Sequence, residues 1–190
     1  MIVTVTLNAA LDRTVSVPNF QPGTRNRATD AVELSGGKGV NIARTLKALG
    51  EPVVATGLAG GRTGTSIIEG LTAEGILNDF VRIRDESRTT TAIVDPNGDQ
   101  TEVIEYGPEI GEDELALFLE KIRFLSRGAD MMVLAGSLPQ NVPGDFYATL
   151  RGELGPGVVV AVDAQGPVLR AALAAGVDVV SPNAREAEEI

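Results

Sequence analysis

Short apolar runs alternate with segments of helical periodicity along most of this chain, and this alternation limits the folds it can adopt. The run at 158–163 is apolar on both of its faces and lies between predicted helices at 143–154 and 167–175. Such a strand is typical of a parallel sheet covered by helices on both sides. Similar runs stand at 2–7, 53–58, 80–83, 131–135 and 177–181. We therefore predict one α/β domain over 1–190, with a Rossmann-like parallel sheet sandwiched by helices.

Two stretches, at about 12–34 and 87–107, break this alternation. The first holds extended pieces around a Pro- and Gly-containing turn. The second holds two β-prone runs joined by Pro-Asn-Gly-Asp, which is typical of a hairpin. We expect these segments to form a small separate β-sheet, a lid lying over the main sheet.

Composition excludes several classes of function. The 190 residues carry a net charge of −10, which argues against nucleic acid or an anionic membrane as the main partner. The absence of cysteine and histidine removes disulfides, thiolate or imidazole metal sites and Ser-His-Asp triads. No apolar run reaches the length of a membrane span, and no leader pattern stands at the N-terminus, so we expect a cytoplasmic location.

A glycine-rich turn runs directly into a predicted helix at 39–49. Gly36, Gly37 and Gly39 allow a tight bend and close approach of a ligand, while Lys38 and Asn41 add a charge and an amide at the helix start. A P-loop would need Ser or Thr after the lysine, and the register does not fit a dinucleotide fingerprint. The turn either binds a polar, anionic small molecule or is a plain turn with a solvated lysine.

Other polar clusters follow predicted strands, where ligands of parallel sheets bind. Asp12 is either a turn cap or an acceptor for sugar hydroxyls, and Ser137 is a turn serine or a ligand group. Asn183 and Glu186 are either a helix cap with a first-turn acid or part of a site. Three arginines of the predicted lid are either solvated charges or a phosphate clamp: Arg25, Arg27 and Arg88.

The order and spacing of these motifs resemble the ribokinase-like (PfkB) carbohydrate kinases, most closely the N-terminal portion of the branch that holds 1-phosphofructokinase and tagatose-6-phosphate kinase. The segments that carry the resemblance are 6–13, 36–43, 57–61, 88–89, 136–139 and 182–186. The resemblance implies a lid that closes over a sugar phosphate and often pairs two subunits, hence a possible homodimer.

The resemblance also implies a role for each matching residue. The sugar would be held by Asp12, Gly36, Gly37, Lys38 and Asn41. The phosphate already on the sugar would be approached by Arg25, Arg27, Arg88 and Ser137. ATP and Mg²⁺ would be organised by Asn183 and Glu186, with Glu186 as the metal ligand.

From this resemblance we expect ATP-dependent phosphorylation of fructose 1-phosphate to fructose 1,6-bisphosphate, with tagatose 6-phosphate as the alternative acceptor. The lid arginines argue against an uncharged acceptor, as in a ribose or nucleoside kinase. The family's catalytic aspartate lies in a Gly-Ala-Gly-Asp segment that residues 1–190 lack. We therefore expect no catalytic residue within the chain, little activity from it alone and an uncovered apolar sheet edge. A non-catalytic sugar-phosphate-binding fragment is the remaining alternative.

Overall fold

A seven-stranded parallel sheet forms the centre of the molecule in a computed structural model that describes residues 1–188. Its main path runs in the order β11-β10-β9-β1-β4-β5, and β6 pairs with β4. The strands are β1 (Ile2–Thr6), β4 (Val53–Gly60), β5 (Leu77–Asn78), β6 (Val81–Ile83), β9 (Met131–Ala135), β10 (Val159–Asp163) and β11 (Val179–Val180). The predicted α/β fold is confirmed.

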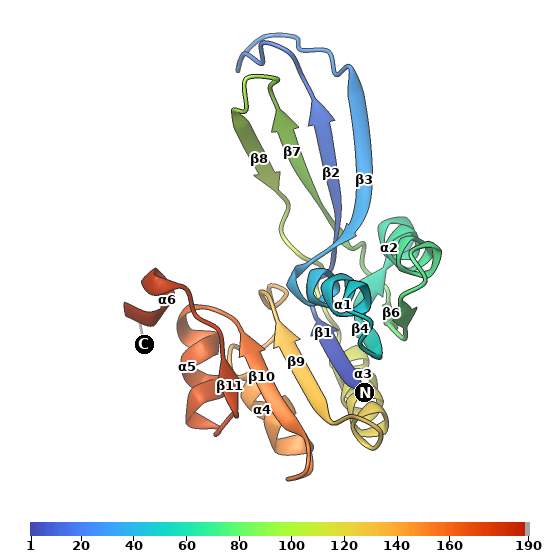
Figure 1. The fold of residues 1–190 in the computed structure, drawn as a ribbon, viewed down its shortest axis with the longest axis vertical. Coiled ribbons are helices and arrows are strands. Elements are labelled where there is room, and N and C mark those ends of the chain that lie inside the picture. The colour runs from blue at the N-terminus through green and yellow to red at the C-terminus, as the bar shows by residue number, and fades with distance from the viewer. Residues whose placement is uncertain (189–190) are drawn as a thin grey trace.

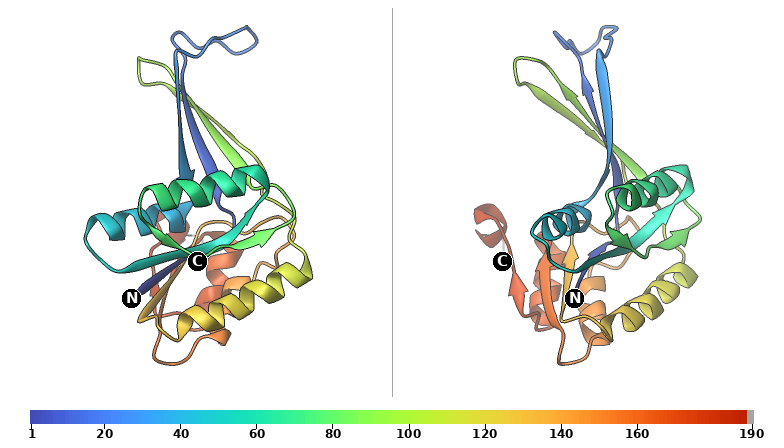
Figure 2. Two further views of the ribbon diagram at one scale, coloured as in Figure 1. Left: turned by 90° about the vertical axis from the view of Figure 1, so that its right-hand side faces the viewer. Right: turned by 45° about the vertical axis from the view of Figure 1, so that its right-hand side comes forward.

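Helices lie on both sides of this sheet (Figures 1 and 2). On one side are α1 (Lys38–Ala48) and α2 (Gly61–Ala73), and on the other are α3 (Glu112–Ser126), α4 (Phe146–Glu153) and α5 (Gly166–Ala174). The short α6 (Ala184–Glu188) follows β11. No helix of the part that the structure describes is long and apolar enough to span a membrane.

The two faces of β10 differ in how well they are covered. Val160 and Val162 are buried in the main core with α4 and α5, whereas Val159 is 39% exposed and Val179 of β11 is 47% exposed. Figure 1 shows no described helix on the α1 side of β10 and β11. The expected covering by helices on both sides holds for β1, β4 and β9, whereas within residues 1–188 the α1-side face of β10 and β11 is partly exposed, because α1 and α2 pack mainly on β1, β4, β5 and β9. The exposed apolar side chains lie next to the end of the sheet that β11 forms.

The predicted second sheet is present, with strand order β3-β2-β7-β8. Its strands are β2 (Ala10–Ser16), β3 (Asp30–Gly36), β7 (Arg88–Val94) and β8 (Gln100–Ile104). At its base Ala10 pairs with both Gly36 and Arg88. The expectation that this sheet lies over the main one is wrong for this structure: it projects away from the α/β layer, because β2 and β3 extend well beyond α1 (Figures 1 and 2).

Candidate functional site

The glycine-rich turn places the start of α1 directly on the end of β1. Gly37 precedes α1 with a φ of 107°, a conformation that favours glycine. A Cβ at Gly39 would lie 2.4 Å from Oγ1 of Thr6 and 2.6 Å from the Val5 carbonyl oxygen. Any side chain at 39 would therefore push α1 away from β1. The backbone N–H groups at the start of α1 consequently lie beside the carboxyl end of β1.

A cavity of about 330 Å³ opens at this end of the sheet, beside the base of the small sheet. It brings together four residues predicted from the sequence: Gly37, Lys38, Arg88 and Ser137. The remaining lining residues are Thr6, Asn8, Ile104, Ala135, Gly136 and Gln165. Segments as far apart in the sequence as Thr6 and Gln165 thus meet in one place, as expected at the carboxyl ends of parallel strands.

Asn8 connects the groups of this cavity, and the sequence did not single it out as a ligand. Its Nδ2 donates to Oγ of Ser137 at 3.2 Å, and its carbonyl oxygen accepts from Nε of Arg88 at 3.3 Å. Asn8 is only 8% exposed, and its buried Oδ1 has no hydrogen-bond partner among the described residues. The signal that could have identified it is its position immediately after a buried strand.

Asp12 lies next to this cavity on β2. A Cβ at Gly36 would be 2.0 Å from Oδ2 of Asp12, so the missing side chain of Gly36 leaves room for this carboxylate. Burial raises the pKa of Asp12, and the nearby charges of Arg88 and Arg44 oppose that rise. Burial also lowers the pKa of the half-buried Arg88, and the charge of Asp12 opposes that fall. The site thus holds a carboxylate and a guanidinium of opposite charge, both partly removed from water.

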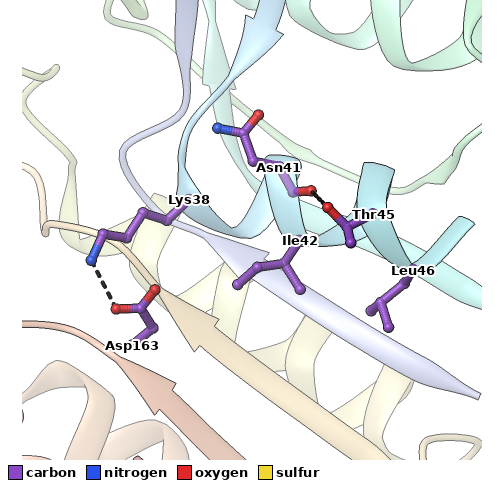
Figure 3. A pocket seen from close by; sticks show the side chains of 6 residues that line it. All are labelled: Lys38, Asn41, Ile42, Thr45, Leu46 and Asp163. Carbon is purple, nitrogen blue, oxygen red and sulfur yellow. Dashed lines mark hydrogen bonds and ion pairs between the residues drawn. The ribbon is translucent and has the colours of Figure 1, made fainter. Parts of the chain in front are cut away.

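A second cavity, of about 370 Å³, lies along α1 and shares Lys38 with the first (Figure 3). Nζ of Lys38 donates to Oδ1 of Asp163 at 2.8 Å. Figure 3 shows Asn41 leaving α1 on the opposite side from Ile42 and Leu46. Asp163 was missed in the sequence, although it too is a polar residue at the end of a strand, here β10.

Asn41 is fixed by a residue that sequence reasoning also missed. Its Oδ1 accepts a hydrogen bond from Nη1 of Arg44 at 2.7 Å, and Arg44 pairs in turn with Glu74 of the segment after α2. Arg44 stands three positions after Asn41 on α1, a spacing that places the two side chains side by side.

Arg25 and Arg27 are not brought to the cavity of their own chain. Both are exposed and lie in the connection between β2 and β3. This connection leaves the small sheet at the Ser16–Asp30 pair, six positions along the strand from the Ala10–Gly36 pair at the base, or about 20 Å.

Asn183 and Glu186 form a reciprocal cap at the start of α6. Oδ1 of Asn183 accepts from the backbone N–H of Glu186, and Oε2 of Glu186 accepts from the backbone N–H of Asn183, each at 2.9 Å. This agrees with the alternative in which Asn183 is a helix cap and Glu186 a first-turn acid. No group of three or more acidic residues that could hold a metal ion is found among residues 1–188.

Comparison with known proteins identifies the family. A family model described as pfkB family carbohydrate kinase matches residues 4–190. Phosphofructokinase-2 from Escherichia coli, solved in complex with fructose-6-phosphate, is 32% identical with a TM-score of 0.92, over 97% of this chain and 62% of that chain. A possible 1-phosphofructokinase from Thermotoga maritima is 31% identical with a TM-score of 0.89, over 97% of this chain and 61% of that chain.

A carbohydrate kinase from Agrobacterium tumefaciens, at 23% identity and a TM-score of 0.72, covers 94% of this chain and 59% of its own and is similar in fold alone. The chain spans about 62% of the length of phosphofructokinase-2. The family match covers nearly every residue, and the solved neighbours share both the parallel sheet and the small sheet region. The chain belongs to the pfkB family of carbohydrate kinases.

Proposed function

We propose that this chain forms the acceptor-binding part of an ATP-dependent sugar-phosphate kinase. The observation that carries the proposal is the cavity in which Lys38, Arg88 and Ser137 meet beside the Asp12 carboxylate. In this proposal Arg88 and Ser137 bind the phosphate that the sugar already carries, because guanidinium and hydroxyl groups donate to phosphate oxygens, and Lys38 helps to hold the sugar. Asp12 accepts from a sugar hydroxyl, and Asn41 donates to one.

The acceptor we propose is fructose 1-phosphate, with fructose 1,6-bisphosphate as the product and tagatose 6-phosphate as the alternative acceptor. The neighbour described as a possible 1-phosphofructokinase and the phosphofructokinase-2 solved with fructose-6-phosphate both support a fructose phosphate. The charged lining of the cavity disfavours an unphosphorylated sugar, because two cations near a neutral ligand would gain no charge partner.

ATP and Mg²⁺ are the proposed cofactors. The donor set at α6 fits, because Mg²⁺ prefers oxygen ligands and is often held by one or two carboxylates with phosphates and water completing its shell. Glu186 would supply the carboxylate, Asn183 would hold it in place through the reciprocal cap, and the ion would neutralise charge on the phosphates of the nucleotide. We assign the catalytic aspartate to a part of the kinase other than residues 1–190, so acceptor binding is the activity proposed for this chain alone.

The small sheet is proposed as a lid and as the contact of a homodimer. Val32, Leu34 and Ile104 lie on one face of that sheet and are each at least half exposed. Packing against a second copy would remove this apolar surface from water. Because Arg25 and Arg27 lie about 20 Å from the cavity of their own chain, the proposal places any phosphate contact they make in the cavity of a partner copy.

Isothermal titration of the 190-residue chain with fructose 1-phosphate tests the proposal. We expect saturable binding that is weaker for fructose by at least 10-fold and that is reduced in Arg88→Met. Tagatose 6-phosphate in the same experiment ranks the two acceptors. Equal affinity for fructose and fructose 1-phosphate, or no binding of any sugar phosphate, would refute the assignment.

A further inference from the structure

Arg44 makes four hydrogen bonds although it does not line either cavity of the site. Its Nε donates to Oε2 of Glu74 at 2.5 Å and its Nη2 to Oε1 of the same carboxylate at 2.8 Å. Nη2 also donates to the carbonyl oxygen of Ser35 at 2.7 Å, and Nη1 donates to Oδ1 of Asn41 at 2.7 Å. One guanidinium thus joins α1 to the residue after α2, to β3 and to a predicted sugar ligand.

The contact with Arg44 determines which way the Asn41 amide faces. A guanidinium carries five N–H donors and no acceptor, so only the oxygen of the amide can face it. With Oδ1 occupied, the Nδ2 group of Asn41 is the side left to meet a ligand. A free asparagine could turn over and offer either group first, whereas this one is held with its Nδ2 donor turned away from Arg44.

The fork shape of arginine is needed for this arrangement. The two contacts with Glu74 are parallel and bidentate, which fixes the plane of the guanidinium and directs Nη1 at Asn41. Arg44 and Glu74 have only 31% and 28% of their side-chain surface exposed, so the pair is partly shielded from water. A lysine could pair with Glu74 but could not hold the same three-way geometry.

We propose that Arg44 is a positioning residue that fixes Asn41 as a hydrogen-bond donor. It thereby determines that a sugar hydroxyl meets a donor at Asn41. The inference rests on the proposed function for the identity of the ligand. Asp12 as a carboxylate only accepts, and Asn41 as held by Arg44 presents its donor, so the pair suits hydroxyls that act as donor toward Asp12 and acceptor toward Asn41.

The direct test is a double-mutant cycle measured by isothermal titration with fructose 1-phosphate. We expect Arg44→Met and Asn41→Ala each to weaken binding about 10-fold, since each removes the oriented donor. Most of the loss from Arg44→Met should disappear in the double variant, because Arg44 acts mainly through Asn41; the part that remains reports its charge beside Asp12. The inference would be overturned if Arg44→Met reduced the affinity for fructose 1-phosphate by the same factor in the presence and in the absence of the Asn41 side chain.

Two further variants separate positioning from a general loss of structure. Asn41→Asp keeps an oxygen facing Arg44 but has no donor, so it should bind as poorly as Asn41→Ala although the thermal midpoint is retained. Lys47→Met is the matched control one turn along α1, because Lys47 contacts the Glu74 carbonyl and not Asn41. It should bind the sugar phosphate like wild type, and wild-type affinity in Asn41→Asp would also overturn the inference.

The inference can fail independently of the proposed function. The ¹H–¹⁵N resonances of the Asn41 side-chain amide in ligand-free protein report its hydrogen bonding directly. Arg44→Met should shift them, Arg44→Lys should shift them less, and Lys47→Met should leave them in place. Unmoved Asn41 resonances in Arg44→Met refute the positioning role. A wild-type chain that binds no sugar phosphate refutes the proposed function instead.

Discussion

Replacing Gly36 by alanine tests whether Asp12 must hold its present position for the sugar to bind. A Cβ at 36 would lie 2.0 Å from Oδ2 of Asp12, whereas real Cβ atoms do not approach other atoms within 3.0 Å. The carboxylate must therefore move by about 1 Å or more, which is enough to break a hydrogen bond. Gly36 is not among the glycines with a positive φ, so the backbone itself accepts alanine.

A hydrogen bond to a charged group contributes about 1.5–3 kcal/mol, so the affinity for fructose 1-phosphate should fall roughly 10- to 100-fold. The matched control is Gly152→Ala in α4, where the added Cβ meets nothing within 4 Å and alanine favours the helix. Titration calorimetry on both variants gives the comparison. If the affinity of Gly36→Ala for fructose 1-phosphate is within twofold of that of the wild type, Asp12 does not accept a hydrogen bond from the sugar.

Three further outcomes are expected. Asp12→Asn should abolish sugar binding without loss of stability at pH 7. Burial raises the folded-state pKa of Asp12 above its ordinary 3.8, so the stability linked to its protonation is complete below that value and is lost as pH rises through the folded pKa. Chemical denaturation across pH should show this dependence in the wild type and not in the variant. Val160→Ala should lower the free energy of unfolding by about 2 kcal/mol and the thermal midpoint by roughly 4–8 °C. Val159→Ala on the uncovered face should lower the free energy of unfolding by under about 0.5 kcal/mol. In titrations with fructose 1-phosphate, Arg88→Met should reduce affinity more than Lys38→Met; the reverse order would contradict the charge distribution of the cavity.

The strands and helices were predictable because their periodicity is local. The apolar run at 131–135 coincides with β9, and the helix predicted at 39–49 is α1 to within one residue. The orientation of the small sheet was not predictable, because it depends on how far β2 and β3 extend beyond α1 rather than on either strand alone. The open face of β10 and β11 likewise depends on which helices are available to cover it.

The site was predictable where a residue type is unusual for its position and hidden where a residue acts through a partner. Lys38 beside three glycines and Ser137 after a buried strand stand out in the sequence, and both line the cavity. In the sequence Arg44 looks like an ordinary polar residue on an amphipathic helix. Its role can be recognised only in the structure, where the packing of α2 brings Glu74 beside it. Asn8 was obscured because a strand-end asparagine also suits a turn.

The charges around the cavity would allow a chain of net charge −10 to attract an anion at this place. Lys38 is paired with Asp163, so much of its field is already compensated. Arg88 makes its hydrogen bond to the carbonyl oxygen of Asn8, which neutralises no charge, and Asp12 is the acid whose field it feels. A hydrogen bond donated by a sugar hydroxyl to the Asp12 carboxylate would weaken that opposing field. Binding of the hydroxyl and of the phosphate should therefore reinforce each other, which favours a ligand that carries both.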